Sequence, residues 1–479
     1  MAGQARPAPV PGRDGSTYPT RLRILSLNCW GLKYLATFRR ERLAEIARLL
    51  AAHPDPPHIV GLQECWTQED YNVIRTAVAD FLPYSKFYFS GIFGGGLAIL
   101  SAFPIIESSM HAYPLNGRPT AFFRGDWFVG KGVACARVKL GPGELDVAEV
   151  FCTHLHAPYE QEPNDSYICH RTAQAWEIAK LMRGAAERGH LVVACGDFNM
   201  VPLSFAHRLI EGHAPVKDVW RIAHPESSTG AADDAWERKR LESLGMRTPN
   251  AQYNVEYNGT TCDSAYNTWR WPKDDQKKLG EYKHGELRTQ EDINEVDDPK
   301  AKRLDYVFVS DRDQLSRGAK SWRVAEANVG MTSRHPVLKC SLSDHFSIET
   351  TLLLDEYNTH STSTYSPPPA LEAEIYDRIQ DMIESYKARE RWQRKARLWH
   401  FGVGLIVSIA CLVAVWWSPR NYVAFILMLV STLSLSTGVI DGLIGGLFVS
   451  AELRALKEFQ WEISTAQQMA KESTRADSA

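Results

Sequence analysis

The chain has 479 residues and a formal net charge of −3, with 23% charged and 44% hydrophobic residues. It is long enough to bury a large core and to hold more than one structural unit. The near balance of charge excludes the strongly basic field that nucleic-acid-binding proteins usually carry. Nine cysteines stand at scattered positions without a C-x-x-C pair. This spacing disfavours a zinc knuckle or a disulfide framework and indicates reduced, cytosolic thiols.

The chain begins with a segment rich in proline, alanine and glycine. Residues 1–20 lack the apolar core of a secretory signal peptide, and we expect them to be disordered. From residue 21 to 356, strand-like and helix-like segments alternate, which predicts two sheets packed together with helices outside. Residues 227–302 are charged and poor in apolar periodicity, so we interpret them as an insertion within this domain.

One predicted strand ends in an unusual group of polar residues. The run LVVACGDFN begins with an apolar strand at 191–194 and then presents Asp197 and Asn199 two residues apart. On an extended backbone such side chains point the same way, and together they suit a hard cation beside an oxyanion. Short D-x-N strings also form Asx turns, so a simple strand-end turn is the alternative.

Other predicted strands end in the same manner. Loops at strand ends are where functional sites are normally built. The further polar residues at such positions are Asn28, Glu64, His154, Asp305, Asp344 and His345. Each residue alone is compatible with an ordinary surface or core group, but the set together predicts one site.

Two long apolar segments lie near the C-terminus. Residues 399–417 carry no formal charge if His400 is neutral, and after a four-residue break a second apolar segment covers 422–440. At 1.5 Å per residue the first segment spans about 28 Å, close to the hydrocarbon thickness of a bilayer. We predict a transmembrane hairpin within 399–450, with a buried hairpin of a soluble protein as the alternative.

The charge around this hairpin predicts its orientation. Residues 387–397 hold six basic residues against one acidic residue, whereas the connecting loop carries only Arg420. This basic excess places both flanks in the cytosol, including a tail at 451–479. Residues 370–398 have helical apolar spacing and predict an amphipathic basic helix, which follows a flexible linker at 357–369. The basic run has two interpretations, ordinary positive-inside flanking or attraction to anionic lipid headgroups.

The strand-end motifs resemble those of the metal-dependent endonuclease/exonuclease/phosphatase superfamily, which has the deoxyribonuclease-I-like fold. The strings that carry the resemblance, in the family's order, are LNCWG, LQE, TH, GDFN, RLDY and SDH. The resemblance implies an α/β four-layer sandwich of two mixed sheets flanked by helices, followed here by the two-helix transmembrane hairpin. Through GGGLAILS, THLHA and TCDS the chain is most similar to the membrane-bound neutral sphingomyelinases, and among them to fungal inositol phosphosphingolipid phospholipases C.

This resemblance implies a Mg²⁺ site at the strand ends. Glu64 is expected to hold the ion, a hard cation that suits carboxylate ligands. Asn28, Asp197 and Asn199 are expected to position the metal and the scissile phosphate, and Asp344 to lie beside the metal.

The resemblance also implies the roles of the histidines. His345 is expected to be the general base that takes a proton from the attacking water, oriented by Asp305. His154 is expected to stabilise the transition state or to assist the leaving oxygen. The nearby His156 is interpreted as a neighbouring surface histidine.

Residues 125–132 nearly match a nucleotide-binding P-loop. Gly132 stands where serine or threonine should hold Mg²⁺, which argues against ATP or GTP binding. By resemblance to a similar segment in neutral sphingomyelinases, Asp126 and Lys131 are expected to control the response to anionic lipid. A glycine-bounded turn with a surface ion pair is the alternative.

The resemblance implies a Mg²⁺-dependent phospholipase C that hydrolyses inositol phosphosphingolipids, with sphingomyelin as a further candidate substrate, and that anionic phospholipid activates. The expected partners are the sphingolipid substrate, anionic phospholipids and the bilayer, and not nucleic acid. The alternatives are a phosphocholine-specific neutral sphingomyelinase and a membrane-tethered nuclease or phosphatase of the same fold. We expect an integral membrane protein of the endoplasmic reticulum with a cytosolic catalytic domain, or else one of the mitochondrial outer membrane. Headgroup preference, metal count and oligomeric state stay open.

Overall fold

The computed structural model describes residues 18–160, 164–281, 286–314, 319–355 and 371–477. Most of the predicted disordered N-terminus and the predicted linker at 357–369 lie outside the described residues. The chain divides into two compact units. The first comprises Met1–Tyr113, Val129–Pro158 and Gln174–Ala370, and the second comprises Pro114–Phe128, Tyr159–Ala173 and Leu371–Ala479.

The first unit contains a six-stranded mixed sheet with the strand order β11-β12-β1-β2-β4-β3. Its strands are β1 (Arg21–Asn28), β2 (Ile59–Gln63), β3 (Tyr84–Tyr88), β4 (Leu97–Ser101), β11 (Trp322–Gly330) and β12 (Ser347–Leu354). The pairing of β1 with β2 is parallel, and β12 pairs with β1 in the antiparallel sense. The parallel pair is the one that brings two strand ends to the same edge of the sheet.

A second six-stranded sheet has the order β5-β6-β7-β8-β10-β9. Its strands are β5 (Ile105–Ala112), β6 (Gly132–Lys139), β7 (Val147–His154), β8 (Leu191–Asp197), β9 (Val216–Asp218) and β10 (Asp305–Ser310). Strands β7 and β8 are parallel and buried along their whole length, which suits the apolar run at the start of β8.

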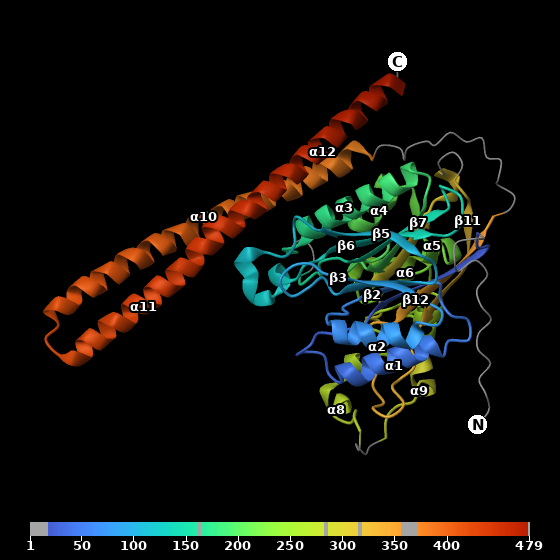
Figure 1. The fold of residues 1–479 in the computed structure, drawn as a ribbon, viewed down its shortest axis with the longest axis horizontal. Helices are drawn as coiled ribbons and strands as arrows, with labels where there is room; N and C mark the ends of the chain where they lie inside the picture. Colours follow the sequence, from blue (N-terminus) through green and yellow to red (C-terminus); the bar gives the residue numbers. More distant parts are fainter. Residues whose placement is uncertain (1–17, 161–163, 282–285, 315–318, 356–370, 478–479) are drawn as a thin grey trace. The chain divides into compact units, whose positions relative to one another are not determined.

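Helices cover the outer faces of the two sheets. The helices α1 (Arg39–Ala51) and α2 (Gln68–Val78) lie on one side, and α3 (Ile168–Glu187) and α4 (Phe205–His213) lie on the other (Figure 1). The inner faces of the sheets approach so closely that a Cβ atom on Gly61 would lie 2.3 Å from Sγ of Cys195. The predicted four-layer α/β sandwich with two mixed sheets is therefore confirmed.

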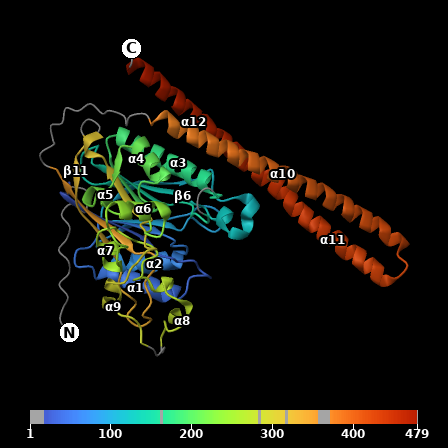
Figure 2. The same ribbon diagram turned by 180° about the vertical axis from the view of Figure 1, so that it is seen from behind.

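The predicted insertion at 227–302 is built from short helices and loops. They follow α5 (Val219–Ala223) and are α6 (Ala235–Ser243), α7 (Ala251–Glu256), α8 (Lys273–Gln276) and α9 (Glu291–Asn294), drawn mostly in yellow-green in Figure 2. Apolar side chains of this segment, including Tyr266, Trp271 and Ile293, form a small core of their own with Phe346. This core supports the loop that carries the predicted SDH motif.

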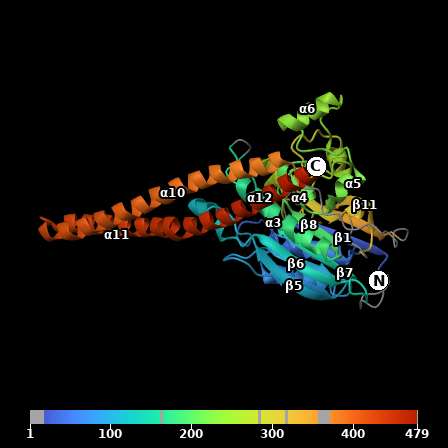
Figure 3. The ribbon, with the colours of Figure 1, turned by 90° about the horizontal axis from the view of Figure 1, so that it is seen from above.

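The second unit is dominated by long helices. They are α10 (Ala373–Ala414), α11 (Asn421–Leu443) and α12 (Val449–Asp477), and α10 runs beside the other two (Figure 3). Two helices of this unit are long and apolar enough to cross a membrane. Where α10 crosses α11, Gly404 and Gly438 allow close backbone approach, and the hydroxyls of Ser408 and Ser431 are 2.8 Å apart.

Two buried glutamates lie between α10 and α12. Oε1 of Glu452 accepts a hydrogen bond from the Tyr386 hydroxyl at 2.6 Å and lies 3.2 Å from Nε2 of His170, while Nε of Arg118 is 3.8 Å from Oε1 of Glu390. Burial raises the pKa of both carboxyls to about 7, and for Glu390 the charge of Glu452 raises it further. The folded unit therefore holds a proton in this cluster that an unfolded chain would release at a lower pH.

This pKa shift predicts how the stability of the helical unit depends on pH. Because both folded pKa values lie above the unfolded values, stability is full at low pH and is lost as the pH rises through about 7. Glu390→Gln keeps the shape without the charge, and we expect it to raise the melting temperature in detergent by about 2–4 °C at pH 8 and by less at pH 5. The exposed Asp381→Asn on the same helix is the control. An equal shift at both pH values would contradict the prediction.

Candidate active site

Strand pairing gathers the predicted site residues at one end of the two sheets. The parallel pairing of β1 with β2 brings Asn28 and Glu64 to the same edge. In the second sheet, parallel β7 and β8 place His154 opposite Asp197, and antiparallel β10 places Asp305 opposite Asp197. Residues that are far apart in the sequence thus become neighbours through strand register alone.

The carboxamide of Asn28 joins the two sheets at this end. Its Nδ2 donates to Oδ2 of Asp197 at 3.0 Å and to Oε1 of Glu64 at 3.2 Å. Its Oδ1 accepts from the backbone N–H of Trp30 at 3.0 Å, which fixes the orientation of the amide. Both Asn28 and Asp197 are buried. Asn28 therefore holds two carboxylates from different sheets in one group.

His345 is held by a buried carboxylate. Its Nδ1 lies 2.7 Å from Oδ2 of Asp305, and its Nε2 lies 3.8 Å from Oδ2 of Asp197. Burial lowers the pKa of His345, but the carboxylates of Asp305 and Asp197 outweigh this effect and raise the pKa well above its ordinary value. A neutral His345 with Nδ1–H donating to Asp305 presents Nε2 as an acceptor on the side of Asp197.

His154 lies on the other side of the same carboxylate. Its Nε2 is 3.5 Å from Oδ2 of Asp197. Burial lowers the pKa of His154 well below its ordinary value, and the positive charges of Lys131 and His345 lower it further. Two histidines with pKa values moved in opposite directions thus flank Asp197.

A bound cation would stabilise the charged form of the carboxylates in this site. Burial raises the pKa of Asp197 to about 7 and that of Asp344 to about 6, and neighbouring acids add to both shifts. Ligand atoms of Asp197, Asp305 and His345 lie within 4.8 Å of one another, close enough to hold a metal ion. Oδ1 of Asp305 is buried and has no hydrogen-bond partner within the described part of the chain. The oxygen-rich donor set therefore fits a hard divalent cation.

This group differs in part from the predicted metal ligands. Asp197 belongs to it as expected, and Glu64 is joined to it through Asn28. The other clustered ligand atoms belong to His345, the predicted general base, and to Asp305, predicted to orient it.

Asn199 and Lys131 meet at one backbone carbonyl. Nδ2 of Asn199 and Nζ of Lys131 each donate to the carbonyl oxygen of Leu155 at 3.0 Å. The backbone N–H of Asn199 also donates to Oδ1 of Asp197 at 2.9 Å, so the GDFN segment does form an Asx turn. The Asx turn is therefore part of the site. It holds Oδ1 of Asp197 and leaves Oδ2 to accept the hydrogen bond from Asn28.

The two predicted regulatory residues fall in different units. Lys131 is only 5% exposed and lies in the first unit, so it is not one half of a surface ion pair. Asp126 belongs to the second unit, where its Oδ2 accepts from the hydroxyl of Tyr159 at 2.8 Å. The prediction that His156 is a surface histidine is wrong. Its side chain is 0% exposed, and its Nδ1 lies 2.8 Å from the carbonyl oxygen of Ala157.

Two supporting residues were not predicted from the sequence. Oγ of Ser343 donates to the carbonyl oxygen of Asn28 at 2.6 Å and accepts from the backbone N–H of His345 at 3.2 Å. Arg42 donates to the carbonyl oxygens of Cys29 and Leu342 from a fully buried position. Both side chains tie the loop after β1 to the loop that carries His345.

The Arg42 guanidinium makes further contacts. Its Nε donates to the carbonyl oxygen of Thr37 at 2.8 Å, its Nη2 donates to that of Trp30 at 2.8 Å, and its Cζ lies 4.6 Å from the Trp30 ring centroid. One planar cation thus satisfies four carbonyls from two loops, which a lysine with a single nitrogen cannot do.

Arg42→Met is therefore expected to lower the free energy of unfolding by on the order of 3 kcal/mol, because several buried carbonyls lose their donor. Chemical denaturation monitored by tryptophan fluorescence measures this change. Arg40→Met is the control, because Arg40 is exposed and pairs with Glu69 at the surface. A loss as small as the control's would show that Arg42 does not hold these loops together.

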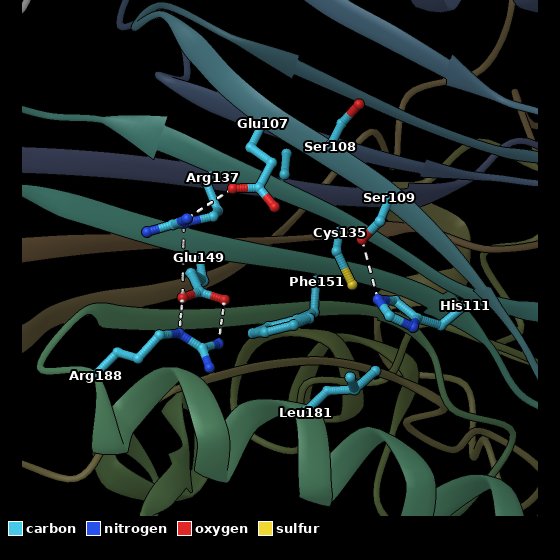
Figure 4. A pocket seen from close by; sticks show the side chains of 11 residues that line it. Glu107, Ser108, Ser109, His111, Cys135, Arg137, Glu149, Phe151, Leu181 and Arg188 are labelled. Atoms are coloured by element: carbon cyan, nitrogen blue, oxygen red, sulfur yellow. Dashed lines mark hydrogen bonds and ion pairs between the residues drawn. The ribbon is translucent and has the colours of Figure 1, made fainter.

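A pocket of about 390 Å³ lies elsewhere in the first unit, against β5, β6 and β7 (Figure 4). Within it Arg188 forms two hydrogen bonds of 2.8 Å with Glu149, and Arg137 pairs with Glu107 at 2.6 Å. None of the predicted site residues lines this pocket. Its charged groups are paired with one another, so we assign the chemistry to the strand ends and not to this pocket.

A two-sheet α/β sandwich with a buried acid–histidine cluster at its strand ends, able to hold a metal ion, suits phosphoester hydrolysis. The Endonuclease/Exonuclease/phosphatase family matches residues 25–345. The chain belongs to this family, and the predicted family and enzyme class are confirmed.

Several curated relatives are similar to this chain. The chain is 39% identical over 459 residues to the inositol phosphosphingolipids phospholipase C of Schizosaccharomyces pombe, covering 94% of this chain and 95% of that protein. It is 32% identical to the protein of the same name from Saccharomyces cerevisiae, covering 93% and 90%. It is also 37% identical to human sphingomyelin phosphodiesterase 2, covering 39% of this chain and 42% of that protein.

Proposed function

We propose that this chain is a Mg²⁺-dependent phospholipase C that hydrolyses inositol phosphosphingolipids to ceramide and a phosphorylated headgroup, with sphingomyelin as a further candidate substrate. The observation that carries the proposal is the buried group of Asp197, Asp305 and His345, joined to Glu64 through Asn28. The substrate class is supported by the relatives that share more than 90% of this chain's length and are named for that activity.

In the proposed mechanism, His345 is the base. Asp305 holds its Nδ1–H, and Nε2 takes a proton from water as the water oxygen attacks phosphorus. The bond between phosphorus and the ceramide oxygen breaks in line with the attack. The leaving oxygen takes a proton from solvent while His154 donates a hydrogen bond to it, and His345 then gives its proton back to solvent. The amide of Asn199 donates a hydrogen bond near the charge that develops on the phosphate oxygens. The amide of Asn28 donates to Asp197 and Glu64 and so positions these two carboxylates.

The proposed metal ligands are Glu64 and Asp197, with Asn28, Asn199 and Asp344 in support. When bound, Mg²⁺ would supply Lewis-acid polarisation of the phosphate. The raised pKa values of Asp197 and Asp344 support a cation here, because a nearby positive charge restores the ionised form of both acids.

Exposed apolar side chains beside the site support a lipid substrate. The loop after β1 contacts the loop of Glu64 through a hydrogen bond from Gly31 N–H, and the loop after β3 does so through Gly96. These two loops expose large apolar residues, among them Tyr34 at 88% and Ile92 at 71%. Such residues next to a polar site suit the acyl and backbone portion of a lipid better than a nucleic acid or a soluble phosphate ester.

We further propose that 399–417 and 422–440 cross the membrane, with the catalytic unit in the cytosol and the endoplasmic reticulum as the compartment. The orientation rests on the basic residues before the first segment. Asp441 then lies at the cytosolic end of the second segment, where it accepts from Arg397 and where its Oδ2 lies 2.7 Å from Nδ1 of His400. Modification of the Asn164 sequon by a glycan in cells would contradict this orientation.

Activation by anionic phospholipid is part of the proposal, with Lys131 and Asp126 as the regulatory residues. Lys131 suits this role because its Nζ donates to the same carbonyl oxygen of Leu155 that accepts from the predicted site residue Asn199. Lys131→Ala is expected to reduce the stimulation of turnover by anionic vesicles to about one. The half-exposed Lys139→Ala, from the next strand, is the control. Unchanged stimulation in Lys131→Ala would rule out the regulatory role.

The test of the function is ceramide release from two lipids, with inositol phosphorylceramide and sphingomyelin assayed side by side. The full-length protein is assayed in mixed micelles with Mg²⁺ and with EDTA. We expect Mg²⁺-dependent release, faster from the inositol lipid. The likeness to human sphingomyelin phosphodiesterase 2 favours phosphocholine specificity as the second candidate, which faster release from sphingomyelin would support. No release from either lipid would overturn the proposed function.

A further inference from the structure

A strained aspartate lies near the candidate active site. Asp263 follows Cys262 in the TCDS segment and has a φ of +60°, in the left-handed region that aspartate and asparagine adopt more readily than most residues. Such a conformation persists where the surrounding structure enforces it, and it often accompanies a functional site. The side chain of Asp263 is 26% exposed, so a ligand can reach it. This residue has no role in the mechanism proposed above.

Backbone pairing places Asp263 beside the proposed base. Cys262 forms isolated antiparallel bridges with both His345 and Lys302. The N–H groups of Cys262 and Lys302 each donate to the other residue's carbonyl oxygen at 3.0 Å. Burial raises the pKa of the Cys262 thiol, and the His345 side chain lowers it, so these two side chains are neighbours. Asp263 and Lys302 are therefore connected to His345 through a single residue.

Asp263 holds two cations at once. Its Oδ2 lies 2.8 Å from Nζ of Lys302, and its Oδ1 lies 3.4 Å from Nε of Arg270. All three side chains are partly exposed. In the described part of the chain, neither cation has a second carboxylate within ion-pair distance. These three residues, the Asp263 group, therefore carry a net positive charge and offer hydrogen-bond donors and acceptors side by side.

The turn that carries Arg270 is fixed to the loop that carries His345. Oδ1 of Asn267 caps the turn by accepting from the backbone N–H of Trp269 at 3.0 Å. Nδ2 of Asn267 donates to the carbonyl oxygen of Ser343 at 3.0 Å, two residues before His345. The backbone of Arg270 is therefore fixed relative to His345 before a substrate binds, and preorganisation of this kind lowers the entropic cost of binding.

The Asp263 group suits a headgroup that is rich in hydroxyls. Each hydroxyl donates one hydrogen bond and accepts others, so neighbouring ring hydroxyls can pair with a carboxylate and with a cation at the same time. Hydrogen bonds to charged groups are stronger than those between neutral groups. Choline offers no hydrogen-bonding group, and its fixed positive charge would meet two cations and one carboxylate. A site built for hydroxyls rejects a ligand that lacks them, because the polar groups of the site stay unpaired.

We propose that Asp263, Arg270 and Lys302 bind the ring hydroxyls of an inositol headgroup and so favour inositol phosphosphingolipids over sphingomyelin. The inference rests on the proposed function, because the headgroup phosphate must lie among the strand-end residues for the ring to reach the Asp263 group. These residues bind the headgroup and take no part in proton transfer. They therefore determine specificity, and their loss leaves hydrolysis of a phosphocholine lipid in place.

The experiment compares two lipids in variants of the full-length protein. In mixed micelles with Mg²⁺, kcat/KM is measured for inositol phosphorylceramide and for sphingomyelin. Asp263→Asn removes the charge and keeps a residue that tolerates the left-handed conformation, and Arg270→Gln removes one cation. We expect each variant to lower kcat/KM for the inositol lipid about tenfold, mainly through KM, and to change that for sphingomyelin less than about twofold. The controls are Asp274→Asn and Lys277→Gln, which break an exposed ion pair of the same segment, and thermal melting verifies that each variant is folded.

Headgroup binding gives a readout that needs no turnover. Isothermal calorimetry in the presence of Mg²⁺ measures the Kd of myo-inositol 1-phosphate and of phosphocholine. We expect the unaltered protein to bind the inositol phosphate at least about fivefold more tightly, and Asp263→Asn and Arg270→Gln to remove this preference. Equal binding of the two headgroups by the unaltered protein would overturn the inference, as would equal losses for both lipids or an unchanged preference in the variants. Release of ceramide from neither lipid would overturn the proposed function, and calorimetry would still decide whether the Asp263 group recognises inositol.

Discussion

Turnover is expected to fall about 10³-fold when His345 is replaced by alanine, because the attacking water loses its base. The prediction rests on the position of His345, whose Nδ1 is held 2.7 Å from Asp305 while Nε2 is directed toward Asp197. Initial rates of ceramide release at saturating Mg²⁺ measure the loss. Because the side chain is buried beside the core of the insertion, the variant's melting temperature must be measured as well.

Glu64→Gln is expected to change the Mg²⁺ dependence of the activity as well as the rate. The amide keeps the size of the side chain and loses the charge that suits Mg²⁺, so we expect a higher Mg²⁺ concentration for half-maximal activity together with a loss of about 10²-fold or more in kcat. Binding of Mn²⁺ followed by electron paramagnetic resonance gives a readout independent of turnover. The exposed Glu144→Gln is the control. Full turnover in both His345→Ala and Glu64→Gln would contradict the assignment of the active site to these strand ends.

The location of the site could be predicted from the sequence because its residues follow directly after recognisable strands. A buried apolar run that ends in a polar residue places that residue at a sheet edge. Parallel pairing then brings two such ends together, as it does for His154 and Asp197. The family motifs supplied the order of the strands and hence the fold. The same pattern could not give the bridge from Asn28 to Asp197, because that hydrogen bond depends on how the two sheets stack.

The residues that sequence reasoning missed share a physical reason. Arg42 lies four residues before Ile46 and eight before Leu50, on the buried face of α1. The sequence around an arginine on such a face does not indicate which groups it contacts. Its partners are backbone carbonyls of loops, which have no sequence signature. His156 was misjudged because burial of a histidine after a strand depends on the packing of α3, whose Gln174 accepts the backbone N–H of His156 at 2.8 Å.

Asp305→Asn is expected to lower kcat by about 10²- to 10⁴-fold with little change in KM, because the amide no longer fixes the Nδ1–H tautomer of His345 or stabilises its protonated form. Asp305 raises the pKa of His345, so its loss lowers that pKa, and the acidic limb of the pH–rate profile should move to lower pH. The exposed Asp313→Asn, from the turn after β10, is the control. A purely structural role for Asp305 would reduce activity in proportion to the folded fraction and leave the acidic limb in place. A shifted limb in a folded variant therefore separates an orienting carboxylate from a buried acid that only supports the fold.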